Sequence, residues 1–249
     1  MPGVQGDAIK AVETLAGVTR APVGSDGLAI WGASPADTRL YIDDIPVPRL
    51  FHRGGLRSIV PAGLVDSVAV VPGGPGPRYG RGLGGVVQVR TAAPDPGWGG
   101  SVAVDPIDAA ATVRAPGLQV GGRYGLLPHT LGPLVPATAV LPVPAFWDAH
   151  LRGQLELPNG DTLSLLVLAV DDQVQRRLPS VLPDDRFTEE TRTGFGRVGL
   201  RVERFEGDVV TMTSGWVGLD GTRTRMDFGE TVVRDETRMA GAGVLLSQE

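Results

Sequence analysis

The chain has 249 residues and a formal net charge of −5; it is 42% hydrophobic and 20% charged. This composition excludes an intrinsically disordered chain, and the charge excludes a basic nucleic-acid-binding surface. The 36 glycines and 21 prolines are an excess typical of a turn-rich β protein, and the absence of cysteine excludes disulfides and thiolate metal sites. No apolar run reaches the ~18 residues of a membrane-spanning helix. Contact with a membrane would therefore require β-strands.

The first ninety residues mix helical and strand patterns. Asp7 can cap a helix that runs through Leu15 and ends at Gly17. The further expected elements are a strand over 28–30, a strand over 39–42 that enters an Asp43-Asp44 turn, a short helix over 54–59, and strands over 64–71 and 86–90. Elements mixed in this way predict a small α+β domain.

A glycine-rich loop is the most distinctive feature of this first domain. Residues Gly73 to Thr91 read GGPGPRYGRGLGGVVQVRT and contain a formal GxGxxG at Gly80, Gly82 and Gly85. A phosphate cradle needs a helix directly after the glycines, whereas an alternating, β-branched strand follows here. The pattern therefore favours a loop whose backbone turns sharply or passes close to another surface.

Beyond the Pro-rich hinge at 92–97, the pattern contains only strands and turns. Arg152, Gln154 and Glu156 alternate with apolar residues over 151–157, Asn159-Gly160 predicts a hairpin, and 162–170 returns. Further strands are expected at 198–202, 209–219, 222–228 and 234–246, with turns at 206–208 and at Asp220-Gly221. Such hairpins are typical of a transmembrane β-barrel, and a soluble β-sandwich is the alternative.

The rest of the sequence contains few candidate catalytic or metal-binding residues. Asp43-Asp44 fits a turn better than an acid–base pair, and Asp171-Asp172 and Asp184-Asp185 are expected to hydrate nearby loops. His52, His129 and His150 lack metal-ligand spacing, so no catalytic, cofactor or metal site and no enzyme activity is predicted. Phe146 and Trp147 fit an interfacial aromatic belt or core packing equally well, and the proline-rich 126–144 is expected to be a loop.

Three blocks resemble, in order and spacing, the plug domain of TonB-dependent outer-membrane receptors. They are GDAIKAVETLAGV (6–18), LAIWGASPADTRLYIDDIPVP (28–48) and LVDSVAVVPGGPGPRYGRGLGGVVQVRT (64–91). The resemblance implies an α+β plug domain over residues 1–95. It also implies that residues 96–249 form antiparallel β-hairpins of an incomplete transmembrane β-barrel, since the 22 strands of about 9–11 residues in large plugged barrels need more chain than 98–249 supplies.

The resemblance also implies two sets of functional positions. One is the plug motif with its contacts to the barrel wall: Asp66, Gly73, Gly74, Arg78, Tyr79, Gly80, Arg81, Gly84 and Gly85. The other is the strand-turn block: Trp31, Gly32, Asp43, Asp44 and Pro46. Trp31 and Ala69 stand where many relatives carry an Arg and a second acid of an ionic latch. Arg78 and Arg81 are the expected substitute cations.

The implied function is that of a receptor and transporter whose plug gates energised uptake of a scarce ligand in the outer membrane of a Gram-negative bacterium. The implied partners are outer-membrane lipid, a ligand of unspecified class and a TonB-type energising protein, with no nucleic acid. The energising protein's binding segment and a signal peptide are not recognised in the sequence, which favours a fragment or a misassigned start. The alternative is a soluble periplasmic or surface module of α+β and β domains that binds another protein.

Overall fold

A computed structural model describes residues 7–20, 27–74, 76, 79, 83–135, 143–178, 187–228 and 231–248. The chain separates into two compact units, Met1–Ala93 and Pro94–Glu249. Within the described ranges, no helix is both long enough and apolar enough to cross a membrane.

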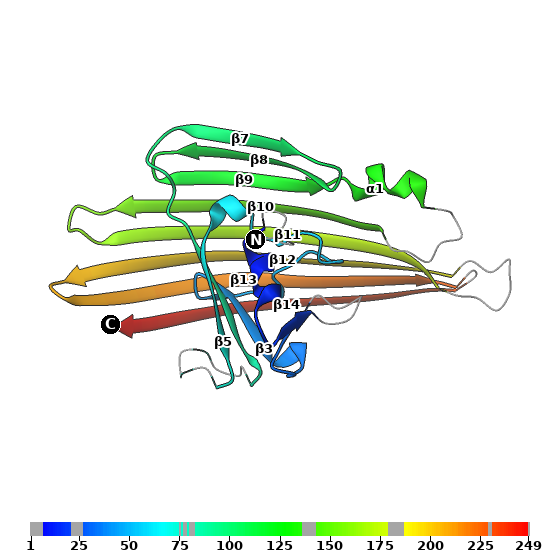
Figure 1. The fold of residues 1–249 in the computed structure, drawn as a ribbon, viewed down its shortest axis with the longest axis horizontal. Helices are drawn as coiled ribbons and strands as arrows, with labels where there is room; N and C mark the ends of the chain where they lie inside the picture. Colours follow the sequence, from blue (N-terminus) through cyan, green and yellow to red (C-terminus); the bar gives the residue numbers. More distant parts are fainter. Residues whose placement is uncertain are drawn as a thin grey trace. The chain divides into compact units, whose positions relative to one another are not determined.

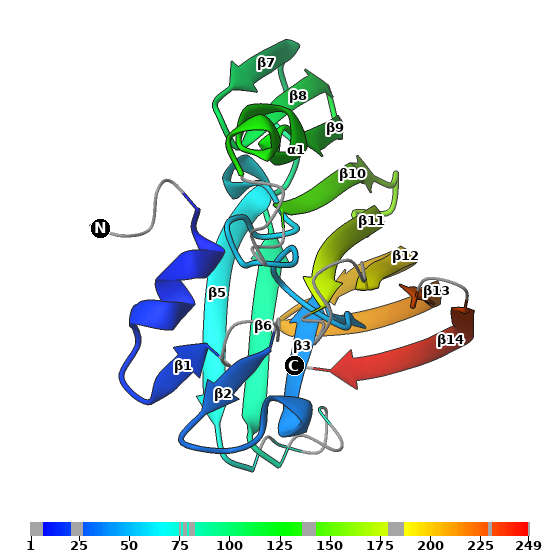
Figure 2. The same cartoon turned by 90° about the vertical axis from the view of Figure 1, so that its right-hand side faces the viewer.

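The first unit is built on a four-stranded sheet with the strand order β4-β3-β6-β5. In this sheet β3 and β6 are parallel, and the two outer pairs are antiparallel. A second, two-stranded sheet joins β1 and β2 (Figure 2). The elements in chain order are η1 (Ile9–Thr14), β1 (Val18–Arg20), β2 (Leu28–Ile30), η2 (Pro35–Asp37), β3 (Thr38–Ile42), β4 (Ile45–Pro46), η3 (Ala62–Leu64), β5 (Val65–Pro72) and β6 (Gly85–Thr91).

The central strand β6 is buried on both of its faces. Successive side chains of a strand point to opposite sides. Because Val86, Val87 and Val89 are all fully buried, both faces of β6 are covered. A run of β-branched residues therefore suits this strand better than polar–apolar alternation does. The edge strand β5 contrasts with it, because none of its side chains is fully buried.

Two helical predictions for this unit need correction. Asp7 Oδ1 accepts hydrogen bonds from the Ile9 and Lys10 amides, but the N-cap residue is Ala8, and η1 is a 3₁₀ helix over Ile9–Thr14. The helix predicted over 54–59 is wrong. Gly54 and Gly55 have φ of 84° and 65°, which a right-handed helix does not allow, and the segment is a loop with an isolated Phe51–Ser58 bridge.

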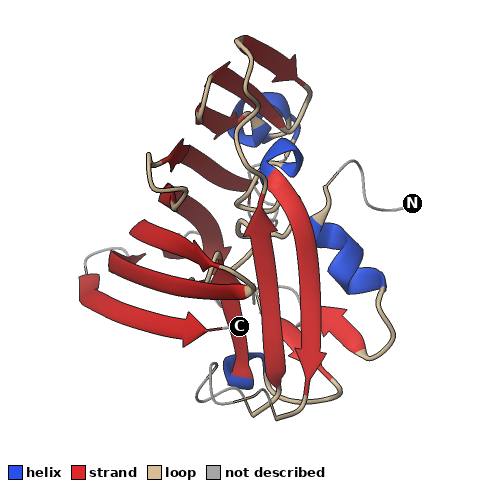
Figure 3. Ribbon diagram, turned by 90° about the vertical axis from the view of Figure 1, so that its left-hand side faces the viewer, coloured by secondary structure: helices blue, strands red, loops and turns tan. Residues whose placement is uncertain are grey.

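The second unit is an open antiparallel sheet of eight strands that follow one another in chain order (Figure 1). Strands dominate it, and its helices are short (Figure 3). Its elements are β7 (Gly99–Val104), β8 (Asp108–Ala115), β9 (Leu118–Gly125), α1 (Leu127–Thr130), η4 (Gly132–Leu134), β10 (Val143–Glu156), β11 (Thr162–Leu178), β12 (Phe187–Glu206), β13 (Val209–Asp227) and β14 (Val232–Gln248). Among the described strands, β7 and β14 each pair on one side only.

The two ends of this sheet differ in the lengths of their connections. At one end short turns join the strands, over residues 116–117, 157–161 and 207–208. At the other end the connections 126–142 and 179–186 are longer, although 105–107 and 228–231 are short. The predicted hairpins at Asn159-Gly160 and at 206–208 are confirmed, with Gly160 and Gly207 both at positive φ.

Three predictions about the strands were wrong. Asp220-Gly221 does not turn, because both residues lie inside β13 and pair with β12 and β14. Asp171 and Asp172 lie within β11 rather than beside a loop, since that strand runs to Leu178. The loop predicted over 126–144 contains α1 and η4, and β10 begins within it at Val143. Asp184-Asp185 lies outside the described residues.

Candidate functional site

The Asp43-Asp44 pair forms the tight turn that the sequence predicted. Both residues adopt left-handed backbone conformations, with φ of 48° and 67°, between the paired residues Ile42 and Ile45. Two consecutive residues at positive φ are the geometry of a type I′ hairpin, which aspartate tolerates better than most side chains. Pro46 in β4 follows directly and pairs with Tyr41.

Both carboxylates of this turn reach distant parts of the same unit. Asp43 Oδ1 accepts a hydrogen bond of 2.9 Å from the Thr91 amide at the end of β6, and the Thr91 hydroxyl donates to Asp43 Oδ2. Asp44 Oδ1 accepts hydrogen bonds from the Gln88 side-chain amide at 3.1 Å and from the Tyr79 hydroxyl at 3.2 Å. The turn therefore connects the strand-turn block with β6 and with the glycine-rich loop.

Aromatic packing supports the same connection. The ring centroids of Tyr41 and Tyr79 lie 4.9 Å apart in a tilted arrangement. Partial burial raises the pKa of Tyr41, and Asp44 contributes in the same direction while Arg39 opposes it. Tyr41 is accordingly a neutral phenol at physiological pH. Tyr79 is the one residue from 77–82 that the structure describes, and it lies against this turn.

The glycine pair at the start of β6 occupies a confined position. Gly85 has φ of 139°, and a Cβ there would lie 2.8 Å from the Val71 carbonyl oxygen and 3.1 Å from Ile30 Cδ1. A Cβ on Gly84 would lie 2.6 Å from Ala33 Cβ, and the Gly84 amide donates to the Asp37 carbonyl at 3.1 Å. Because neither residue has a Cβ, the chain can enter β6 close to β5 on one side and to the segment after β2, at Ala33, on the other.

The other predicted plug positions lie at the surface. Trp31 has φ of 51° and a side chain 70% exposed, and its amide donates to the Gly17 carbonyl at 2.7 Å. Gly32 and Gly73 adopt φ of 78° and 75°, and a Cβ on Gly74 would meet nothing within 4 Å. Asp66 is exposed at a register shift between β5 and β6, where it forms a β-bulge.

Three predicted site residues, Arg78, Gly80 and Arg81, lie outside the described residues. Their contacts with a barrel wall, and those of the rest of the predicted plug motif, stay predictions. The described residues contain no group of three or more His, Cys, Asp or Glu side chains that could hold a metal ion.

The sheet of the second unit has two chemically different faces. Paired residues on neighbouring strands point to the same side, so the register assigns each side chain to a face. We call one face the apolar face. Across β10–β14 its middle carries Leu151, Leu155, Leu163, Leu165, Val167, Val198, Leu200, Val202, Val217, Leu219, Val244 and Leu246.

The opposite face, here the mixed face, combines buried apolar residues with buried charges. Arg123 Nε lies 2.8 Å from Asp148 Oδ2, with side-chain exposures of 7% and 1%. Arg197 lies 2.9 Å from Asp220 and within 6 Å of the Phe195 and Trp216 ring centroids. Sequence reasoning missed these ion pairs, although the strict alternation of β10 and β12 already placed Asp148 and Arg197 opposite the leucines and valines.

Exposure on this sheet is the reverse of that in a water-soluble protein. Val244, Leu246 and Leu219 on the apolar face are 82%, 70% and 67% exposed, whereas Asp148 and Arg197 on the mixed face are 2% and 5% exposed. Tyr124 and Trp147 lie on the apolar face of β9 and β10 and form a cross-strand pair. Phe146 points to the mixed face and is buried. Of the two adjacent aromatic residues, Phe146 therefore packs in the interior, whereas Trp147 lies on the apolar face.

Comparisons with known proteins show what the chain is similar to. Residues 4–86 match the family model of the TonB-dependent receptor plug domain. The siderophore receptor PirA from Acinetobacter baumannii is a similar solved structure, with 13% identity, a TM-score of 0.48, and coverage of 98% of this chain and 52% of PirA. The ferric citrate transporter FecA has 17% identity, a TM-score of 0.46 and coverage of 96% and 45%, in the same order.

The pyoverdine receptor FpvA from Pseudomonas aeruginosa has 12% identity and a TM-score of 0.44, and the alignment covers 92% of this chain and 50% of FpvA. The chain thus spans about half the length of these structures. A search of curated proteins gave no match.

The family match and the geometry agree for the first unit. Residues 4–86 match the TonB-dependent receptor plug domain in the same part of the chain as the three sequence blocks. The predicted fold class, an α+β plug domain followed by antiparallel strands that do not close into a barrel, is confirmed.

Proposed function

We propose that this chain forms the plug and part of the barrel wall of a TonB-dependent receptor in the outer membrane of a Gram-negative bacterium. The inverted exposure of the second unit is the observation that carries this proposal. A band of apolar side chains about 20–25 Å tall along the strands suits the hydrocarbon core of a bilayer. The buried charges on the mixed face suit the polar interior of a plugged barrel.

The plug would gate uptake rather than catalyse a reaction. Its glycine-rich loop enters the sheet at Gly85, beside Thr38 at the start of β3, and the Tyr79–Asp44 hydrogen bond ties the loop to the Asp43-Asp44 turn. Loss of the Tyr79 contacts with Asp44 and Tyr41 would loosen the loop while the buried β6 strand stays in place. Energy supplied through a TonB-type protein would act on such a locally held segment. The cargo would be a scarce and bulky ligand.

Membrane fractionation combined with uptake tests this proposal. An epitope-tagged copy at the native locus should sediment with the outer membrane and resist extraction by carbonate. Deleting the gene should abolish accumulation of one member of a labelled panel of iron chelates, cobalamin, glycans and peptides, and a protonophore should have the same effect. Recovery of the tagged protein in the soluble periplasmic fraction would instead support the alternative, a soluble interaction module.

A further inference from the structure

The apolar face of β11–β14 carries a groove that the function proposed above does not use. Three adjoining depressions of about 700, 770 and 560 Å³ lie along it. The first two share Ala169, Gly196, Leu219 and Ala240, and the second and third share Val198, Val217 and Ala242. The depressions are therefore one continuous groove that runs along the strands.

Small residues make the floor of this groove. Gly194, Gly196 and Gly221 lie on the apolar face of β12 and β13 and line the first depression. A Cβ on Gly221 would meet nothing within 4 Å, so glycine is not required there by the backbone. Ala169, Gly196, Gly221 and Ala240 in this floor carry no side-chain hydrogen-bonding group, and the β12 and β13 backbones are paired on both sides.

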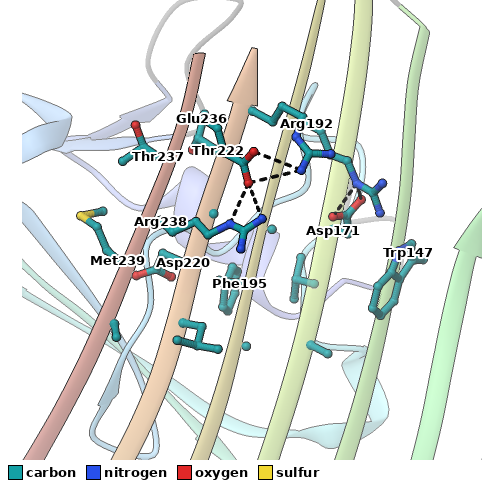
Figure 4. A pocket seen from close by; sticks show the side chains of 18 residues that line it. Trp147, Asp171, Arg192, Phe195, Asp220, Thr222, Glu236, Thr237, Arg238 and Met239 are labelled. Atoms are coloured by element: carbon teal, nitrogen blue, oxygen red, sulfur yellow. Dashed lines mark hydrogen bonds and ion pairs between the residues drawn. The ribbon is translucent and has the colours of Figure 1, made fainter. Parts of the chain in front are cut away.

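Exposed arginines border one end of the groove. Arg192 contacts Asp171 at 2.8 Å. Arg223 and Arg238 both contact one carboxylate, Glu236, through donor–acceptor distances of 3.2 Å and 2.7 Å (Figure 4). Because two guanidinium groups share one carboxylate, this cluster keeps an excess positive charge. The three arginine side chains are 52%, 59% and 77% exposed, so an external anion can reach them.

The position of this cluster along the strands is also informative. It lies toward the sheet end that carries the 126–142 and 179–186 connections, away from the short turns. In outer-membrane barrels the short turns face the periplasm and the longer loops face outward. If the second unit spans the outer membrane as proposed above, the arginines lie at the level of the outer-leaflet headgroups.

We propose that the groove binds an anionic, phosphate-bearing lipid of the outer leaflet. Its phosphate would pair with Arg223 and Arg238, and an acyl chain would lie over Gly221, Gly196 and Ala240. Arginine matches phosphate oxygens in geometry as well as in charge. A protein segment fits the floor less well, because its backbone groups would find no partner there, whereas an acyl chain has none to satisfy.

Trp147 provides the probe, because it lines the groove beside Asp171. The receptor would be extracted from its outer membrane and reconstituted in liposomes, and flotation would show that it has inserted. The emission of Trp147 is the difference between the fluorescence of the wild type and that of the W147F variant. Its quenching would be measured as the fraction of phosphatidylglycerol with brominated acyl chains is increased. Phosphatidylcholine with the same brominated chains is the control for headgroup charge.

The account predicts half-maximal quenching at a phosphatidylglycerol fraction at least fivefold lower than for phosphatidylcholine. The double variant R223Q/R238Q should abolish that preference, since each arginine near a membrane surface contributes roughly a fivefold factor. G221L, which fills the floor, should reduce quenching by both lipids. R204Q is the matched control, since Arg204 lies on the apolar face near the short-turn end and should behave like the wild type.

Equal quenching by the two lipids in a chain that floats would overturn this inference and leave the proposed function standing. Protection of Trp147 by a second copy of the chain, seen as a cross-linked dimer through Gly221→Cys, would also overturn it. A receptor that fails to float with liposomes would contradict the proposed function itself, and with it this inference.

Discussion

Replacing Gly85 by alanine should destabilise the plug strongly, because two separate costs arise at one position. The backbone φ of 139° is a conformation that side-chain-bearing residues rarely adopt, which costs roughly 1–3 kcal/mol. The new Cβ would also lie 2.8 Å from the Val71 carbonyl oxygen, and overpacking of this kind costs roughly 1–3 kcal/mol more. The sum is about 2–6 kcal/mol, against the roughly 5–14 kcal/mol expected for a domain of this size.

Thermal unfolding of residues 1–95, followed by circular dichroism, measures this effect. A loss of this size should lower the midpoint by about 10–30 °C in a small domain. Gly74→Ala is the matched control, since its Cβ meets nothing within 4 Å, and it should leave the midpoint unchanged or raise it slightly. If Gly85→Ala melts with the wild type, the glycine pair is only a flexible linker and the argument from close approach is wrong.

Three further predictions concern the two units. Residues 1–95 alone should fold and protect the β6 amides from hydrogen exchange, and uniformly fast exchange would contradict an independent plug. Asp43→Ala should lower the free energy of unfolding by about 2–3 kcal/mol in a urea titration, because it strains a left-handed residue and leaves the Thr91 amide without its carboxylate. Asp66→Ala at the exposed bulge should lower it by under about 0.5 kcal/mol in the same titration. The 249-residue chain alone should show no conductance in planar bilayers, because the unpaired edges of β7 and β14 leave backbone groups that hydrocarbon cannot satisfy, and stable channel currents would refute this.

Local sequence signals predicted the elements whose conformation is set mainly by residues adjacent in the chain. The β3 and β6 strands, the Asp43-Asp44 turn and the Asn159-Gly160 hairpin combine alternation or β-branching with residues that tolerate positive φ. The Asp220-Gly221 turn failed because an Asp-Gly pair can also lie in a strand. There, pairing with β12 and β14 and the Asp220–Arg197 ion pair override the local turn preference.

The contacts that build the plug site could not be read from local patterns. Asp43 binds Thr91 48 residues away, and Asp44 binds Tyr79 35 residues away. These contacts depend on the parallel pairing of β3 with β6, which brings the turn beside the end of β6. The family blocks indicated which positions mattered, while the hydrogen bonds between those blocks required the structure.

Site-directed spin labelling across residues 163–170 tests the central claim most directly, because the chain has no native cysteine to interfere. Single cysteines would be labelled in the receptor in its outer membrane, and each label's accessibility to oxygen and to a water-soluble nickel chelate would be compared. The account predicts alternation with a period of two, in which labels at 163, 165, 167 and 169 meet oxygen in the bilayer and the labels between them do not. High accessibility of the odd-numbered positions to the nickel chelate would show that this face meets water, and would contradict a membrane-spanning sheet.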